Sequence, residues 1–121
     1  MDVADLCPCG SGLTYADCCG RLHVGLANAV TAEQLMRSRY AAFAVGDAAY
    51  LEDTWHPSTR PATVELGEGL TWLSLQVIDA QDDQVEFVAR FRGPGGSGFV
   101  RERSQFVQQG GRWLYLAPVE V

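Results

Sequence analysis

Hydrophobic residues recur at helical spacing in the first half of the chain. Between residues 32 and 45 the apolar positions fall near one helical stripe: Leu35, Met36, Tyr40, Phe43 and Ala44. Thr31 precedes this stripe as an N-cap, with Gln34 at the capping-box position, and Gly46 follows as a C-terminal stop. The pattern predicts a helix over 32–45. A second helix is expected from a cap at Asp47 through Trp55.

Four strand-like runs fill the second half, over residues 70–80, 85–92, 99–108 and 112–118. Short turns separate them, at 81–83, in a glycine-rich loop at 93–98, and at 110–111. Short turns between neighbouring strands predict an antiparallel meander. Alternation places Val85, Phe87, Ala89 and Phe91 on the inward face of the second run. Two helices followed by four strands predict an α+β sandwich.

Length and charge narrow the class of protein. A chain of 121 residues is one domain by length, and its net charge is −6. All nine cationic residues are arginines, spread along the chain, which argues against a broad nucleic-acid surface. No apolar run approaches the roughly 20 residues that a membrane span requires. The acidic N-terminus lacks signal-peptide features, so we expect a cytoplasmic protein without membrane contact.

Four cysteines carry the strongest chemical signal. Cys7, Cys9, Cys18 and Cys19 all lie within thirteen residues. Persistent disulfides are not expected in a reducing cytosol, and this crowding suits a tetrahedral ion better than two unstrained bridges. Four thiolates favour zinc, and a closed ligand set predicts a structural rather than a catalytic ion. Disulfides or free thiols remain the alternatives.

His23 lies four residues beyond Cys19 and offers a further nitrogen ligand. Because the sulfur set is already complete, a surface or packing role is favoured for this histidine.

Residues 7–20, Cys-Pro-Cys-Gly-Ser-Gly-x5-Cys-Cys-Gly, resemble the SEC-C motif, the zinc-binding element at the C-terminus of the SecA translocation ATPase. The SecA version usually ends Cys-His, whereas this chain has Cys-Cys. The wider chain resembles the YchJ-like family, through residues 18–23, 36–43, 54–60 and 111–115.

The resemblance implies a SEC-C zinc knuckle over residues 1–25. It also implies a cystatin-like (nuclear transport factor two-like) cone over 26–121, with two or three helices packed on a curved four-stranded antiparallel sheet. It implies no reaction.

Cones of this kind commonly enclose a cavity between helices and sheet. The candidate lining residues are Tyr40, Tyr50, His56, Glu102, Ser104 and Trp113, and Arg39 is placed to reach the same region. Glu102 and His56 would make an acid/base pair. A structural interpretation is favoured over this pair: His56 closes a helix with its ring hydrogen-bonded to backbone, and Glu102 forms a buried ion pair with Arg90.

Three functions follow from these features. The favoured one is a protein-interaction adaptor that binds through the zinc knuckle. SecA uses its similar motif to meet a chaperone and the ribosome, so the expected partner, by analogy, is protein-biogenesis machinery. The alternative is a small-molecule binding protein or an enzyme using the cone cavity, although the sequence leans away from an enzyme. A weaker alternative is a thiol-based metal or redox sensor.

Overall fold

A curved antiparallel sheet forms one side of the molecule in the computed structural model, which describes residues 4–67 and 69–119. Its strands are β1 (Thr71–Ala80), β2 (Gln84–Gly93), β3 (Gly96–Gln109) and β4 (Arg112–Pro118). They pair in chain order, each antiparallel to the next. The predicted α+β meander is confirmed.

The glycine-rich segment between β2 and β3 is shorter than expected. Residues 93–98 were predicted as a six-residue loop, but Gly93 pairs with Gly96 across a tight turn. Gly96 has a φ of 110°, which favours glycine there. At Gly98 a Cβ atom would lie 2.8 Å from the Phe91 ring, so the absent side chain lets this ring pack against β3. The third strand therefore begins at Gly96 rather than at Phe99.

The main helix, α2 (Ala32–Val45), has the predicted bounds. Thr31 Oγ1 accepts a hydrogen bond from the Gln34 N–H at 3.0 Å, and Gly46 ends the helix with a φ of 80°. The expected capping box is displaced by one residue, because Gln34 Oε1 accepts from the Val30 N–H instead of the Thr31 N–H.

Two short helices flank α2. Helix α3 (Ala48–Asp53) begins after the predicted Asp47 cap, but it ends two residues before Trp55. Trp55 instead forms an isolated parallel bridge with Tyr115 of β4, and this pairing takes it out of the helix. Helix α1 (Cys19–His23) was not predicted. None of the described helices is long and apolar enough to cross a membrane.

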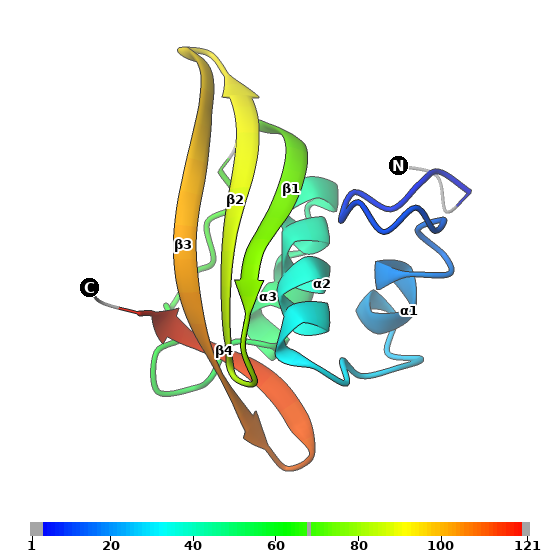
Figure 1. Ribbon diagram of the computed structural model, residues 1–121, viewed down its shortest axis with the longest axis vertical. Helices are drawn as coiled ribbons and strands as arrows, with labels where there is room; N and C mark the ends of the chain where they lie inside the picture. Colours follow the sequence, from blue (N-terminus) through cyan, green and yellow to red (C-terminus); the bar gives the residue numbers. More distant parts are fainter. Residues whose placement is uncertain (1–3, 68, 120–121) are drawn as a thin grey trace.

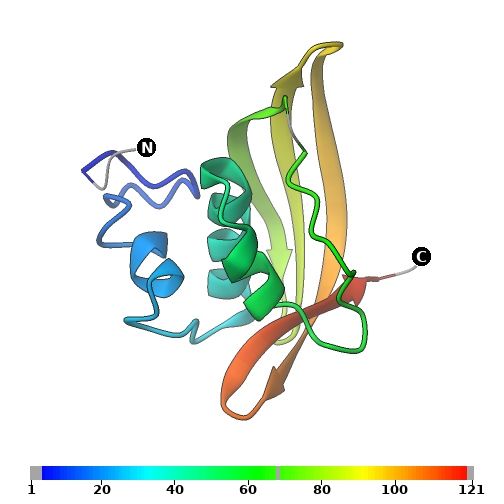
Figure 2. The same cartoon turned by 180° about the vertical axis from the view of Figure 1, so that it is seen from behind.

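Helix α2 is the middle layer of the fold. Figures 1 and 2 show the sheet on one side of α2, and α1 with the N-terminal loop on the other. The main core lies between helices and sheet and contains Leu35, Leu51, Val85 and Phe106, all nearly inaccessible to solvent. Ala41 of α2 packs separately against the cysteines. The helix is therefore buried from two sides.

The boundary expected between residues 25 and 26 lies within this packed arrangement. Leu22 and Ala29, on either side of it, both belong to the main core cluster. Residues 1–3 of the expected knuckle, and Glu68 and residues 120–121 of the expected cone, lie outside the described residues.

Candidate metal centre and cone cavity

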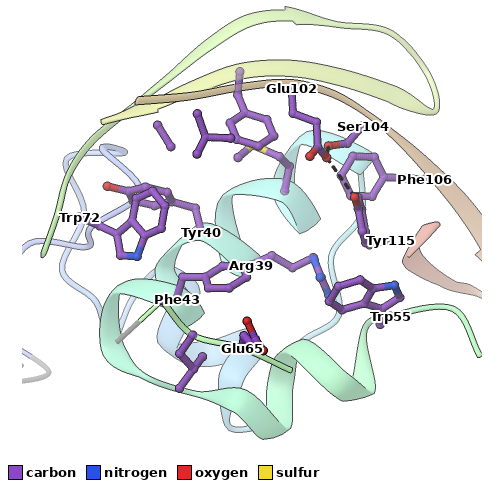
Figure 3. A pocket seen from close by; sticks show the side chains of 16 residues that line it. Arg39, Tyr40, Phe43, Trp55, Glu65, Trp72, Glu102, Ser104, Phe106 and Tyr115 are labelled. Atoms are coloured by element: carbon purple, nitrogen blue, oxygen red, sulfur yellow. Dashed lines mark hydrogen bonds between the residues drawn. The ribbon is translucent and has the colours of Figure 1, made fainter. Parts of the chain in front are cut away.

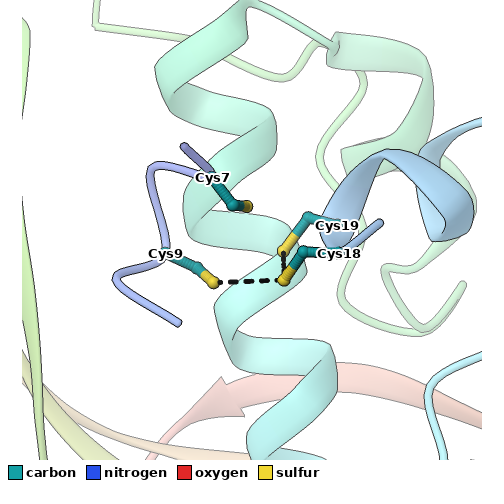
Figure 4. Close-up of side chains that lie close together, drawn as sticks. All are labelled: Cys7, Cys9, Cys18 and Cys19. Carbon is teal, nitrogen blue, oxygen red and sulfur yellow. Dashed lines mark hydrogen bonds between the residues drawn. The ribbon is translucent and has the colours of Figure 1, made fainter. Parts of the chain in front are cut away.

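The four cysteine sulfurs converge on one point beside α2 (Figure 4). All four Sγ atoms lie within 4.8 Å of one another. Cys18 Sγ lies 3.6 Å from Cys9 Sγ and 3.9 Å from Cys19 Sγ. These separations far exceed the roughly 2 Å of a disulfide bond, and all four cysteines are free. The cluster can hold one metal ion.

A tight loop delivers the first two cysteines. The Cys7 N–H donates to the Leu13 carbonyl at 2.8 Å, and the Gly10 N–H donates to the Cys7 carbonyl at 3.2 Å. Gly10 and Gly12 have φ values of 84° and 86°, a region that favours glycine. The glycines after the first cysteine pair are therefore needed for the backbone conformation of the loop, and the cysteines supply the sulfurs.

A second contact delivers Cys18 and Cys19. The Tyr15 carbonyl accepts hydrogen bonds from the Cys18 N–H at 3.1 Å and from the Gly20 N–H at 2.8 Å. This double acceptor sets the start of α1. A Cβ atom on Gly20 would lie 2.5 Å from the Tyr15 carbonyl oxygen, so only glycine fits.

Side chains of α2 hold the cluster in place. Arg37 Nη1 donates to the Cys9 carbonyl at 2.7 Å, while Arg37 Nε pairs with Glu33 one helical turn earlier. Ala41 has no solvent-exposed surface and contacts the cysteines. A larger residue at position 41 would push the cluster away from the helix.

His23 packs between the knuckle and α2. Its Nε2 lies 2.8 Å from the Ser38 carbonyl oxygen and donates to it, which leaves Nδ1 to accept from the Tyr15 hydroxyl at 2.5 Å. The side chain is 2% exposed. Because both ring nitrogens are occupied, His23 has a packing role in this structure and the sulfurs supply the ligands.

Mutual hydrogen bonds couple the protonation of the clustered sulfurs. Hydrogen bonds from Cys19 and Cys7 lower the pKa of Cys9 well below its ordinary value. Hydrogen bonds to Cys7 and Cys9 raise the pKa of Cys19 in turn. A divalent cation would replace the protons that these sulfurs share, because metals bind thiolates and not thiols.

On the opposite side of α2, the cone encloses a cavity of about 330 Å³ (Figure 3). Three of the candidate residues, Tyr40, Glu102 and Ser104, line this cavity, and so does Arg39. Glu102 Oε2 accepts hydrogen bonds from the Tyr115 hydroxyl at 3.0 Å and from the Ser104 hydroxyl at 2.5 Å. The strand register explains the placement, because Glu102 pairs with Phe87 on the inward face of β2.

The other three candidates lie elsewhere. Tyr50 and Trp113 line a second hollow beside α1 and α3, and the Tyr50 hydroxyl bonds to Ser38 at 2.7 Å. His56 lies among exposed residues, with Nδ1 2.7 Å from the Ser58 hydroxyl. His56 is therefore not part of the cavity lining and forms no pair with Glu102. As the favoured structural interpretation predicted, its ring bonds to backbone, with Nδ1 accepting from the Ser58 N–H at 3.1 Å.

The expected ion pair between Glu102 and Arg90 is wrong. Arg90 pairs with Phe99 across the hairpin, and its guanidinium lies 5.9 Å from the centre of the Phe99 ring. Strand alternation places Arg90 and Glu102 on opposite faces of the sheet. Glu102 finds its partners within β3 and β4 instead.

Sequence reasoning missed several lining residues, among them Trp55, Glu65 and Trp72. Trp72 lies on β1, where two register shifts interrupt the pairing with β2 and with it the simple alternation of faces. Trp55 was expected inside a helix, and Glu65 lies in a segment without a clear periodic pattern. No local sequence pattern marks these positions as cavity residues. They reach the lining only because the folded chain brings the segment between α3 and β1 over the sheet.

The fold and the sulfur cluster together define a class: a protein with an N-terminal SEC-C cysteine motif and an NTF2-like α+β domain. The model of the SEC-C motif matches residues 4–21, and the model described as "YchJ, middle NTF2-like domain" matches residues 31–118. The chain therefore belongs to the YchJ-like family, as its sequence motifs predicted.

Similar proteins agree with this assignment. A UPF0225 protein of Deinococcus radiodurans is 51% identical over 94% of this chain and 88% of its own length. One from Streptomyces coelicolor is 48% identical over 90% of each chain. The solution structure of a SEC-C motif containing protein from Rhodopseudomonas palustris has a TM-score of 0.81 at 39% identity, covering 95% of this chain and 98% of that one. A crystal structure from Psychrobacter arcticus, also of a SEC-C motif containing protein, has a TM-score of 0.79 at 28% identity, covering 98% and 86%.

Proposed function

We propose that this protein binds one structural zinc ion through Cys7, Cys9, Cys18 and Cys19, and that the zinc knuckle serves as a protein-interaction adaptor. The spacing of the sulfurs carries the metal part of the proposal. Zinc–sulfur bonds of about 2.3 Å in a tetrahedron require sulfurs about 3.8 Å apart. The separations of 3.6 and 3.9 Å around Cys18 fit that figure.

The surroundings of the cluster support a structural role. Four sulfurs fill a tetrahedral shell and leave no position for substrate or water. Cys7, Cys9 and Cys19 are buried, so the ion would lie beneath the loop and not at its surface. This favours an adaptor over a metalloenzyme.

The outer surface of the knuckle supports binding to a protein. Leu6 is 66% exposed and Leu13 is 52% exposed; Leu6 forms an antiparallel bridge with Thr14, the residue after Leu13. Apolar side chains held on a metal-braced loop can bury area on a partner at little cost in conformational entropy. By analogy with SecA, the partner would be the ribosome or the chaperone that SecA meets.

Metal analysis of protein purified under reductant tests the first part. We expect one equivalent of zinc per chain, and less than a tenth of that in the double variant Cys18→Ser, Cys19→Ser. Cobalt substitution should give the intense absorption bands of a tetrahedral tetrathiolate. Protein without bound metal that also fails to take up zinc or cobalt on titration would refute the site.

Co-sedimentation with purified ribosomes tests the adaptor role, with the SecA-associated chaperone as a second binding partner in a separate assay. The double variant Leu6→Ser, Leu13→Ser should retain zinc and lose binding. The matched control is Leu73→Ser, which removes an exposed leucine from β1, far along the chain from the knuckle. Equal binding by both variants, or binding of neither partner by the zinc-loaded protein, would rule the adaptor role out.

A further inference from the structure

The cone cavity contains a buried cation without a carboxylate partner. Arg39 is 7% exposed, and its Nη1 donates to the Leu51 carbonyl at 2.9 Å and to Thr54 Oγ1 at 2.8 Å. Among the described residues its Nε and Nη2 make no hydrogen bond, and no carboxylate lies within ion-pairing distance. A buried charge with free donors is costly unless an anion meets it.

Aromatic rings fix the position of this cation. The Arg39 guanidinium carbon lies 5.0 Å from the centre of the Trp55 ring and 4.7 Å from that of the Tyr115 ring. Figure 3 shows the side chain reaching across the cavity to this pair. Burial lowers the pKa of Arg39 to about 10, which leaves the group charged at neutral pH. The planar guanidinium is therefore held as a donor toward the cavity.

An acceptor lies on the facing wall. Both hydrogen bonds to the Glu102 carboxyl group end on Oε2, and Oε1 has no partner among the described residues. Tyr115 connects the two polar groups, since its hydroxyl donates to Glu102 and its ring contacts Arg39. The second acid in the lining, Glu65, is exposed at the rim, where solvent screens its charge.

The rest of the wall is apolar and mostly aromatic: Met36, Tyr40, Phe43, Trp72, Phe87 and Phe106. A volume of about 330 Å³ is at the small end of the range for ligand pockets. The indole N–H groups of Trp55 and Trp72 are also buried here without a hydrogen-bond partner among the described residues. Flat walls with one charged donor, Arg39, and one charged acceptor, Glu102, select a planar ligand that carries both complements. An organic cation would meet Arg39, and a purely apolar ligand would leave Arg39 unpaired.

We propose that this cavity binds a planar aromatic carboxylic acid bearing a hydroxyl group. The ligand carboxylate accepts from Arg39, and its hydroxyl donates to Glu102 Oε1. The site lies across α2 from the sulfur cluster, so it goes beyond the adaptor function and does not depend on it.

Three naphthalene probes that differ in their polar groups test this proposal on the zinc-loaded chain. They are 6-hydroxy-2-naphthoate, 2-naphthoate and 2-naphthylmethylammonium, measured by calorimetry. Fluorescence of the tryptophans provides a second readout, because Trp55 and Trp72 line the cavity. We expect the hydroxynaphthoate to bind about tenfold more tightly than naphthoate, the effect of one hydrogen bond to a charged group. The ammonium probe should not bind.

Two variants identify the residues responsible. Glu102→Gln should remove most of the tenfold advantage of the hydroxyl group while naphthoate still binds. Arg39→Lys keeps the charge but loses the planar fork, so both acids should bind at least fivefold more weakly. Trp113→Phe, in the second hollow, is the control and should bind like the wild type.

Three results would overturn the proposal. These are an absence of binding by all three probes, equal binding of the ammonium and carboxylate probes, and an unchanged hydroxyl advantage in Glu102→Gln. Because Glu102→Gln and the wild-type probe series do not depend on a variant of Arg39, a folding defect in Arg39→Lys leaves the test decisive.

Discussion

A single methyl group at Gly20 should disrupt the cysteine cluster and weaken the zinc site proposed there. The Cβ of an alanine there would lie 2.5 Å from the Tyr15 carbonyl oxygen, whereas ordinary contact begins at 3.4 Å, so the two atoms must separate by about 0.9 Å. The obstacle is backbone and cannot rotate aside. Gly20 has no positive φ, so the effect of Gly20→Ala is steric and involves no change in backbone preference.

The magnitude follows from the bonds that this displacement breaks. The Tyr15 carbonyl accepts from both the Cys18 and the Gly20 N–H groups, and each bond contributes about 0.5–1.5 kcal/mol net. Loss of both costs about 1–3 kcal/mol. Because these bonds position Cys18 and Cys19, the loss should weaken zinc affinity, by roughly 5- to 140-fold at 1.4 kcal/mol per tenfold.

Competition with a chromogenic zinc chelator under reductant measures this affinity. Arg21→Ala is the matched control, because it changes the next residue of α1, whose side chain is exposed. We expect Arg21→Ala to bind zinc like the wild type. If Gly20→Ala also stayed within twofold of the wild type, the idea that this carbonyl sets the geometry of the second cysteine pair would be refuted.

Further perturbations probe the two sides of α2. Arg37→Ala should lower the free energy of unfolding of the zinc-loaded protein by about 1–2 kcal/mol in urea, since it removes the bond to the Cys9 carbonyl; no change would show that this bond does not hold the knuckle. Leu51→Ala should cost about 2–5 kcal/mol in the same assay, because the side chain is completely buried, and a loss below 1 kcal/mol would contradict a tightly packed core. Burial raises the pKa of Tyr40 to about 12, so its contribution to stability is complete below pH 10 and should be lost as the pH rises toward 12; alkaline unfolding curves of the wild type and Tyr40→Phe should diverge in that window, and parallel curves would contradict the shift. Removal of zinc with a chelator should increase amide hydrogen exchange over residues 4–19 and leave the sheet protected, because the cysteine cluster and the main core are separate; loss of protection in β2 and β3 would show one cooperative unit.

Local sequence patterns were sufficient to predict those elements whose ends are set by caps and short turns. The bounds of α2 follow from Thr31 and Gly46, since a cap and a left-handed glycine act within a few residues. The bounds of β4 and the order of the strands follow from short turns and alternation in the same way. The grouping of the four cysteines was also evident from the sequence, because all of them lie within thirteen residues. The structure brings their sulfurs together as that spacing predicted.

Long-range contacts decided the cavity. Trp55 leaves its predicted helix to pair with Tyr115, sixty residues away along the chain, and the ring of the next residue, His56, bonds to Ser58 and does not line the cavity. Trp72 and Glu65 join the lining through strand irregularity and a crossing loop. The residue types at positions 56 and 102 indicate which acid or base groups are available. Only the path of the folded chain decides that Glu102 lines the cavity and His56 does not.

The amino-acid sequence by itself determined the family, the grouping of the cysteines and the order of helices and strands. Each of these is set by short motifs and by patterns among residues close in the chain. The tertiary structure alone decided that α2 is buried on two sides, with Ala41 packed against the cysteines. A periodic pattern can mark only one apolar stripe, so it could not indicate that a second layer covers the opposite face of the helix.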